Sequence, residues 1–243
     1  MITSIEVAHP KLYISRMDKI IPKLNFSDNK KKALYALCYA IFALTIDSIS
    51  TIHLKWGIDW GIFHWQLKNG FEVSTFILWF AIPFIFTYKS IDWQYFGVSR
   101  LKKNDIYVVI LLSALGMIAV LSIKFFPGLR RFYPSIAFQN ASAKLNWALY
   151  KMIWTMSWLT GWEFLHRYVL LTCFENAFPK KGWFGVCLIE FVFHFQKAFL
   201  EAIGMLIFSV IVTYWAYKRK NIILPFFSHL LIESFLLLLI LFE

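Results

Sequence analysis

Long apolar runs, separated by short basic connections, are the feature that most constrains what this chain can fold into. A helix needs about 20 consecutive, mostly apolar residues to cross the hydrocarbon core of a bilayer. Runs of roughly this kind occur at residues 33–52, 73–88, 106–125, 145–174, 182–199, 202–217 and 222–242. The fourth run is longer than one crossing requires, so we expect it to be tilted, broken or extended past the lipid. The sequence therefore predicts an all-α, polytopic membrane helix bundle with seven transmembrane helices.

Composition agrees with a membrane protein and excludes an ordinary soluble domain. Apolar residues make up 59% of the 243 residues and charged residues only 16%, whereas soluble domains average about 45–50% and about 25%. The 25 Lys and Arg exceed the 14 Asp and Glu, for a net charge of +11. The basic residues lie between the apolar runs and not on one polar face, so we interpret them as topology signals in contact with the bilayer. Nucleic acid is excluded as a partner on the same ground.

The distribution of basic residues also predicts an orientation. Residues 1–32 carry seven Lys and Arg, and we expect them to form a cytoplasmic N-terminal segment that is either interfacial or solvated. With that segment in the cytoplasm, three basic connections fall on the same side, as the positive-inside rule requires. These connections are residues 89–105, 180–181 and 218–220.

One connection fits this orientation poorly. Residues 126–144 hold Arg130, Arg131 and Lys144, and they fall on the side that should carry few basic residues. A re-entrant or additional span within this connection would remove the conflict and raise the count to eight. In either case residues 33–243 are predicted to form a single transmembrane domain.

Ionisable residues inside apolar runs are costly in a bilayer, which makes them candidates for function. They gather in the C-terminal half in three groups, each with a carboxylate and a histidine. The groups are Glu163 with His166 and Arg167, Glu190 with His194, and His229 with Glu233. Spacings of three and four residues put the members of a group on one helix face. If the three faces converge, they could activate a water molecule or hold a metal ion.

Structural explanations compete with these functional ones. A single membrane histidine is often only a hydrogen-bonded packing residue, and Arg167 beside Glu163 could be an ion pair that permits burial of both. Four other charged residues are interpreted structurally: Lys197 and Glu201 as an interfacial ion pair, Asp47 as facing water and Lys151 as snorkelling. Tryptophans in the fourth run are interpreted as helix packing or an aromatic belt.

The order and spacing of the three groups resemble the CPBP family, the CAAX protease and bacteriocin-processing (Abi) intramembrane proteases. The motifs of that family are EExxxR, FxxxH and HxxxN or HxxxD on successive core helices. Here the corresponding segments read WEFLHR at 162–167, EFVFH at 190–194 and HLLIE at 229–233. The resemblance covers about residues 145–235 and implies a CPBP-like core at about 145–243.

The resemblance implies an intramembrane endopeptidase that hydrolyses a hydrophobic or lipid-modified peptide with a Glu/His-activated water. The implied catalytic residues are Glu163, His194, His229 and Glu233, with His166, Arg167 and Glu190 in support. In this scheme a carboxylate and His194 deprotonate the water. His229, with the residue at 233, polarises the carbonyl group, and Arg167 holds Glu163. The bacterial branch of the family implies location in a bacterial inner membrane.

The chain also departs from the motifs. Trp162 stands in place of the first glutamate, Glu190 in place of phenylalanine and Glu233 in place of asparagine. Two hypotheses follow: a divergent active enzyme, or a catalytically inactive CPBP-fold membrane protein with a binding or immunity role. A proton-coupled transporter is a third class, but the paired repeats typical of transporters are not visible. The metal requirement stays open: His and Glu could hold Zn²⁺, yet no HExxH spacing occurs.

Overall fold

The computed structural model describes residues 29–56, 65–133 and 135–242, so the predicted N-terminal segment at 1–32 lies almost entirely outside the described residues. Helices form most of the described part and no strand occurs within it, which confirms the predicted all-α class. The bounds of the longer elements are α2 Asn29–Trp56, α5 Asp105–Ser122, α7 Ala141–Glu163, α9 Gly182–Phe193, α10 Phe199–Arg219 and α11 Ile223–Phe242.

Short elements extend or join these helices. A continuous helical segment, called the second rod because it follows α2, consists of α3 (Val73–Phe76), η1 (Ile77–Ala81) and α4 (Ile82–Thr87). Helix α7 is prolonged by η5 (Phe164–Leu170) and α8 (Leu171–Ala177). The connections contain η2 (Tyr88–Ser90), η3 (Trp93–Phe96), η4 (Val98–Arg100), α6 (Pro127–Arg130) and η6 (His194–Gln196). Each apolar run of the sequence thus contains a helix.

Within the described residues, four helical segments are long and apolar enough to cross a bilayer: Val73–Ser90, Asp105–Ser122, Phe199–Arg219 and Ile223–Phe242. Large apolar side chains on the outside of α5, such as Ile110 and Ile118, are more than half exposed, as expected for a surface that faces lipid. These helices indicate an integral membrane protein. The count of seven to eight spans stays a prediction, since α9 is apolar but only 12 residues long.

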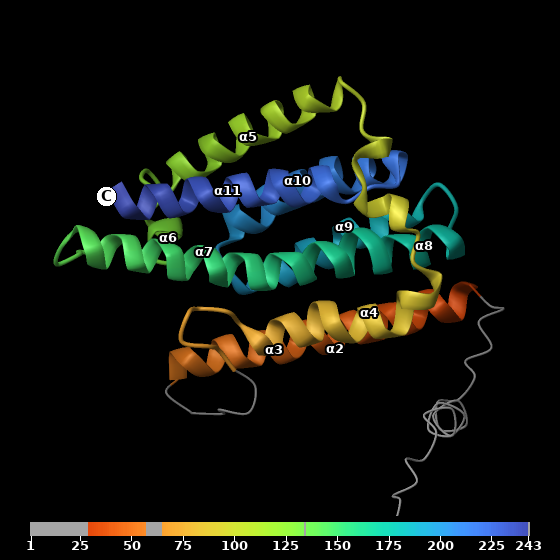
Figure 1. The fold of residues 1–243 in the computed structure, drawn as a ribbon, viewed down its shortest axis with the longest axis horizontal. Helices are drawn as coiled ribbons and strands as arrows, with labels where there is room; N and C mark the ends of the chain where they lie inside the picture. The colour runs from red at the N-terminus through yellow and green to blue at the C-terminus, as the bar shows by residue number, and fades with distance from the viewer. Residues whose placement is uncertain (1–28, 57–64, 134, 243) are drawn as a thin grey trace, which may run out of the picture.

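Successive long helices run in opposite directions along the bundle, so their connections gather at two ends (Figure 1). Helix α11 packs between α5 and α7, α9 packs on α10, and α2 and α9 both contact α8. One end carries the start of α2 and the α4–α5, α8–α9 and α10–α11 connections. This basic end holds Lys30, Lys31, Lys32, Lys89, Arg100, Lys102, Lys103, Lys180, Lys181, Lys218, Arg219 and Lys220. The opposite end carries α6 and the α9–α10 connection.

Close contact between the second rod and α7 depends on Gly161. A Cβ atom at this position would lie 2.7 Å from Trp79 Cβ and 3.1 Å from the Trp79 backbone carbon. No heavy atoms of ordinary residues approach so closely without a shift, so glycine lets η1 and α7 come into direct contact. This contact places Trp79 beside Trp162, with ring centroids 5.3 Å apart.

The α7 helix changes to π-type hydrogen bonding directly after Glu163, over residues Phe164–Leu170. The wider turn rotates successive side chains by less than an α-helix does. Within the first motif, the two residues that follow Glu163 at three and four positions make different contacts. Arg167 reaches Glu163, but His166 turns back to hydrogen-bond the Trp162 carbonyl oxygen through Nδ1 at 2.9 Å.

Candidate functional site

Three charged side chains from the predicted motifs are completely buried and contact one another. Arg167 Nη1 donates to Glu190 Oε1 at 2.6 Å, and Arg167 Nε lies 3.5 Å from Glu163 Oε2. All three residues have an exposed fraction of 0%. A cation shared by two carboxylates lowers the cost of burying each of them, because an unpaired charge in a low-dielectric interior is strongly disfavoured. The arginine therefore holds the first motif against α9.

Two more helices join this buried chain of charges. His229 of α11 lies with Nδ1 2.8 Å from Glu163 Oε1, and Ser209 of α10 donates its hydroxyl hydrogen to Glu190 Oε2. The network thus runs from His229 through Glu163, Arg167 and Glu190 to Ser209. It ties α7 and η5, α9, α10 and α11 together and fixes the position of His229.

The second motif histidine is fixed in a similar way. His194 follows directly after α9, and its Nδ1 lies 2.8 Å from the backbone carbonyl oxygen of Glu190. Carbonyl and carboxylate oxygens accept hydrogen bonds, so Nδ1 carries the proton in both His194 and His229. In each neutral ring Nε2 is then the nitrogen left to accept a proton. The structure orients two imidazoles so that each has one nitrogen available for chemistry.

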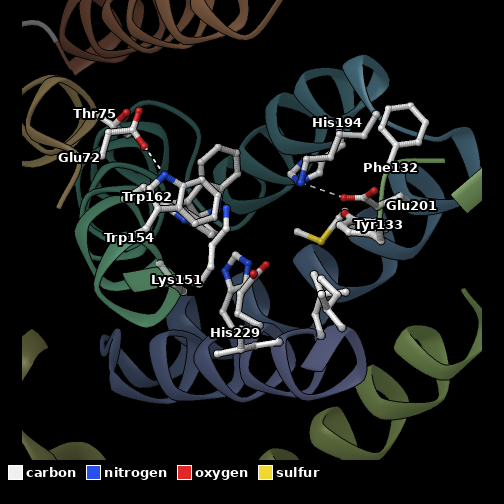
Figure 2. Close-up of a pocket in the computed structure, with 18 of the residues that line it drawn as sticks. Glu72, Thr75, Phe132, Tyr133, Lys151, Trp154, Trp162, His194, Glu201 and His229 are labelled. Atoms are coloured by element: carbon white, nitrogen blue, oxygen red, sulfur yellow. Dashed lines mark hydrogen bonds and ion pairs between the residues drawn. The ribbon is translucent and has the colours of Figure 1, made fainter. Parts of the chain in front are cut away.

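Both histidines line one cavity of about 550 Å³, which lies toward the end of the bundle opposite the basic end. Its polar lining comes from Asp47, Glu72, Lys151, His194, Lys197, Glu201, His229 and Glu233. Figure 2 shows His194 and Glu201 on one side of the cavity, and His229 and Lys151 on the other. Two histidines with carboxylates around a shared space are a chemically suitable setting for proton transfer to and from a water molecule.

Trp162 forms part of the cavity wall where the resembled family has its first glutamate. Its ring lies at a tilt against His166 with centroids 4.1 Å apart and meets His194 edge to face at 5.6 Å. Only 3% of Trp162 is exposed. Its Nε1 has no hydrogen-bond partner within the described part of the chain. The cavity-facing position of the first motif is therefore aromatic, and carboxylates reach the cavity from other helices.

The structure divides the predicted site residues into two sets. His194, His229 and Glu233 line the cavity. Glu163, Arg167 and Glu190 lie behind it in the buried network and contact the cavity through His229. His166 is also fully buried and is separated from the cavity by the Trp162 ring. The convergence of the three motifs is thus present, but the motif-one carboxylate orients a histidine and does not itself face the cavity.

Several residues that the sequence suggested were structural also line the cavity. Asp47 and Lys151 belong to its wall, so both side chains border the site, and the expectations that they face water or snorkel stay predictions. Tryptophans of α7 line it too: Trp147, Trp154, Trp158 and Trp162. The ion pair between Lys197 Nζ and Glu201 Oε1 is confirmed at 3.0 Å, and it too borders the cavity.

Glu72 is a cavity carboxylate that sequence reasoning did not single out. It lies at the start of α3, and its Oε2 accepts a hydrogen bond from Trp154 Nε1 at 2.6 Å. Its only sequence signal is a lone carboxylate directly before the second apolar run. The connection between α6 and α7 contributes Tyr133 to the cavity wall. The pKa of its phenol is raised mainly by burial and also by the carboxylates of Glu201 and Glu233. The ammonium group of Lys197 opposes this rise. The phenol therefore remains protonated at neutral pH and can donate a hydrogen bond.

A metal centre is not formed by the side chains that the structure describes: no three His, Cys, Asp or Glu residues among them are grouped so that they could hold an ion.

The known proteins give no further guidance on the cavity. Comparison of the chain with models of protein families, with curated proteins and with solved structures found no match.

Proposed function

We propose that this protein is a membrane-embedded endopeptidase that hydrolyses a peptide bond in a hydrophobic or lipid-modified peptide. One observation carries the proposal: the carboxylate of Glu163 fixes His229 at 2.8 Å, and this imidazole shares a cavity with His194. A buried carboxylate that holds a histidine in one tautomer is the arrangement that hydrolases use to stabilise a transient imidazolium. The CPBP-like order of the motifs supports the same reaction class.

The different surroundings of the two histidines suggest their roles. His194 is held by a neutral carbonyl oxygen, so it serves as the base that takes a proton from the attacking water through Nε2. His229 is held by the Glu163 carboxylate, the arrangement that stabilises a transient imidazolium in hydrolases, so it serves as the acid that protonates the leaving amine. The water oxygen bonds to the carbonyl carbon as one of its protons passes to His194, and the C–N bond breaks as His229 protonates the amine. His194 then releases its proton to water and His229 takes one up from water, which restores both rings. The cavity-lining Tyr133 is a suitable hydrogen-bond donor to the oxyanion.

We further propose that the basic end of the bundle faces the cytoplasm, that seven helices cross the membrane, and that α9 crosses together with its flanking connections. Cytoplasmic connections are enriched in Lys and Arg. In a bacterium this places the protein in the inner membrane with its N-terminus inside. The cavity then lies toward the outer face, and substrates enter from that side or from the adjacent lipid.

Cleavage by purified protein in proteoliposomes tests the function. With a quenched fluorescent library of apolar peptides as substrate, we expect His194→Ala, His229→Ala and Glu163→Ala each to lower the cleavage rate at least about 100-fold, the usual size of an acid–base contribution. Glu175→Gln is the matched control, because this carboxylate lies in α8, away from the cavity, where its Oε1 accepts a hydrogen bond from the Trp183 backbone N–H. Full activity of either histidine variant, with the fold intact by circular dichroism, contradicts the proposal.

A second candidate function, peptide binding without hydrolysis, is favoured by the indole of Trp162 beside His194. Under this alternative the family fold is retained and the position of the water-binding carboxylate is filled by an aromatic wall. Equal binding of a peptide by wild type and by His194→Ala, with no cleavage by either, would support it.

A further inference from the structure

The cavity combines an unusual number of aromatic rings with an excess of negative charge. Five tryptophans line it: Trp79, Trp147, Trp154, Trp158 and Trp162. Its wall also holds four carboxylates, from Asp47, Glu72, Glu201 and Glu233, against the two ammonium groups of Lys151 and Lys197. Aromatic faces attract cations through their quadrupole, most strongly in desolvated sites and for tryptophan above all. Both features therefore favour a positively charged group in the cavity.

The ammonium group of Lys151 shows how the aromatic wall of the cavity can hold a cation. Lys151 Nζ lies over the ring of Trp154, 4.4 Å from its centroid. The Trp154 Nε1 hydrogen is in turn donated to Glu72 at 2.6 Å, which makes the indole more electron-rich and strengthens its attraction for a cation. Among the described residues no carboxylate lies within ion-pair distance of Lys151. The aromatic face is therefore in direct contact with this ammonium, and Glu72 and Glu233 act on it from a greater distance.

Glu233 supplies the charge that a second cation would meet. It lines the cavity one turn after His229 on α11. Lys151 and Lys197 act on it electrostatically, but it makes no direct hydrogen bond or close ion pair with any residue that the structure describes. Glu201 differs, since Lys197 neutralises it at 3.0 Å. A peptide ligand whose scissile bond lies beside His229 could carry an ammonium or guanidinium group nearby. This group would pair with Glu233.

Unpartnered donors in the same wall indicate that the ligand also offers hydrogen-bond acceptors. Trp79 and Trp162 are 4% and 3% exposed, and within the described residues neither Nε1 has a partner. A buried N–H group without a partner is costly, and bound ligands commonly satisfy such groups. Peptide carbonyl oxygens are suitable acceptors, whereas a simple amine carries none.

From these observations we infer that the cavity selects peptides with a basic side chain, Lys or Arg, within an otherwise apolar segment, and that Glu233 pairs with this side chain. The inference rests on the proposed function for its choice of a peptide as ligand. It assigns Glu233 to substrate selection, and it makes Lys151 an internal competitor for the aromatic face.

Equilibrium binding to matched peptides tests this inference without reliance on cleavage. The probes are an acetylated and amidated Leu/Ala peptide with one central Lys and the same peptide with norleucine, which has a similar length and no charge. Binding to detergent-purified wild-type protein is followed in the cold by tryptophan fluorescence, and mass spectrometry verifies that the peptides stay intact. We expect the Lys peptide to bind at least about tenfold more tightly, the size expected for a desolvated cation–π contact with an added ion pair.

Two variants locate the effect. Glu233→Gln should reduce the preference for Lys to less than about threefold, while Lys151→Met should increase it, because the competing ammonium is removed. Glu175→Gln, which alters a carboxylate distant from the cavity, should keep the wild-type preference. Equal binding of the two peptides to wild-type protein, or an unchanged preference in Glu233→Gln, overturns the inference. A preserved preference in a protein that cleaves nothing overturns the endopeptidase proposal alone.

Discussion

At the scale of single residues, the buried charges explain how polar groups survive inside an apolar bundle. Arg167 hydrogen-bonds Glu190 and lies within ion-pair distance of Glu163. The other carboxylate oxygen of Glu163 accepts a hydrogen bond from His229. Each charge is compensated by a neighbour on another element, so none of them is tolerated alone. The same contacts that permit burial also set the tautomer of His229, so stability and the proposed function depend on the same side chains.

Removal of one member of this network should be strongly destabilising. We expect Glu190→Ala to lower the free energy of unfolding by about 3–5 kcal/mol, because Arg167 would lose its 2.6 Å partner and keep a buried charge. Thermal unfolding in detergent, followed by circular dichroism, measures the change. Glu190→Gln keeps an acceptor for the arginine and should cost less. If Glu190→Ala melts like wild type, the arginine is not held as described.

At the scale of elements, the apolar runs of the sequence predicted where the helices lie but not how they are built. Hydropathy determined the positions of α5, α10 and α11, because a bilayer demands long apolar helices. The change to π-type turns at Phe164–Leu170 could not be predicted, since it depends on packing of η5 against neighbouring helices. Sequence reasoning likewise could not predict that His166 would bond the Trp162 carbonyl oxygen and pack on the Trp162 ring.

Close helix contact at Gly161 gives a test at this scale. Gly161→Ala adds a methyl group that meets Trp79 Cβ at 2.7 Å, and overpacking of this kind typically costs about 1–3 kcal/mol. Gly204→Ala is the matched control within another helix, because its new methyl group meets no atom within 4 Å. It should stabilise the protein by about 0.5–1 kcal/mol through the usual helix preference for alanine. Paired melting curves measure both changes, and equal melting temperatures would contradict the close contact.

At the scale of the whole molecule, the bundle has a basic end and a cavity end. The motif order predicted that the three C-terminal groups converge, and His194 and His229 do share a cavity. Glu72 and Asp47 could not be assigned to it from sequence, since they come from α2 and α3, far from the motifs along the chain. Their place in the site follows only from the packing of the N-terminal helices against α7 and α8.

Cysteine accessibility measures the proposed orientation. The three native cysteines are free and are first replaced by serine. Single cysteines at the exposed positions Lys103 and Lys181 then report on the basic end, and a cysteine at Arg131 reports on the cavity end. In intact cells a membrane-impermeant maleimide should label only the cysteine at 131, because the basic end faces the cytoplasm. The reverse pattern would place the cavity on the cytoplasmic side.

The central claim is that two fixed imidazoles direct a water molecule onto a peptide bond, and isotope transfer tests it most directly. Cleavage is carried out in water enriched in oxygen-18, and the mass of each newly formed C-terminus is measured. The account predicts one heavy oxygen in every new carboxylate from wild-type protein, and at least about 100-fold less of this product from His229→Ala. Cleavage without uptake of the heavy isotope, or undiminished labelled product from His229→Ala, would contradict it.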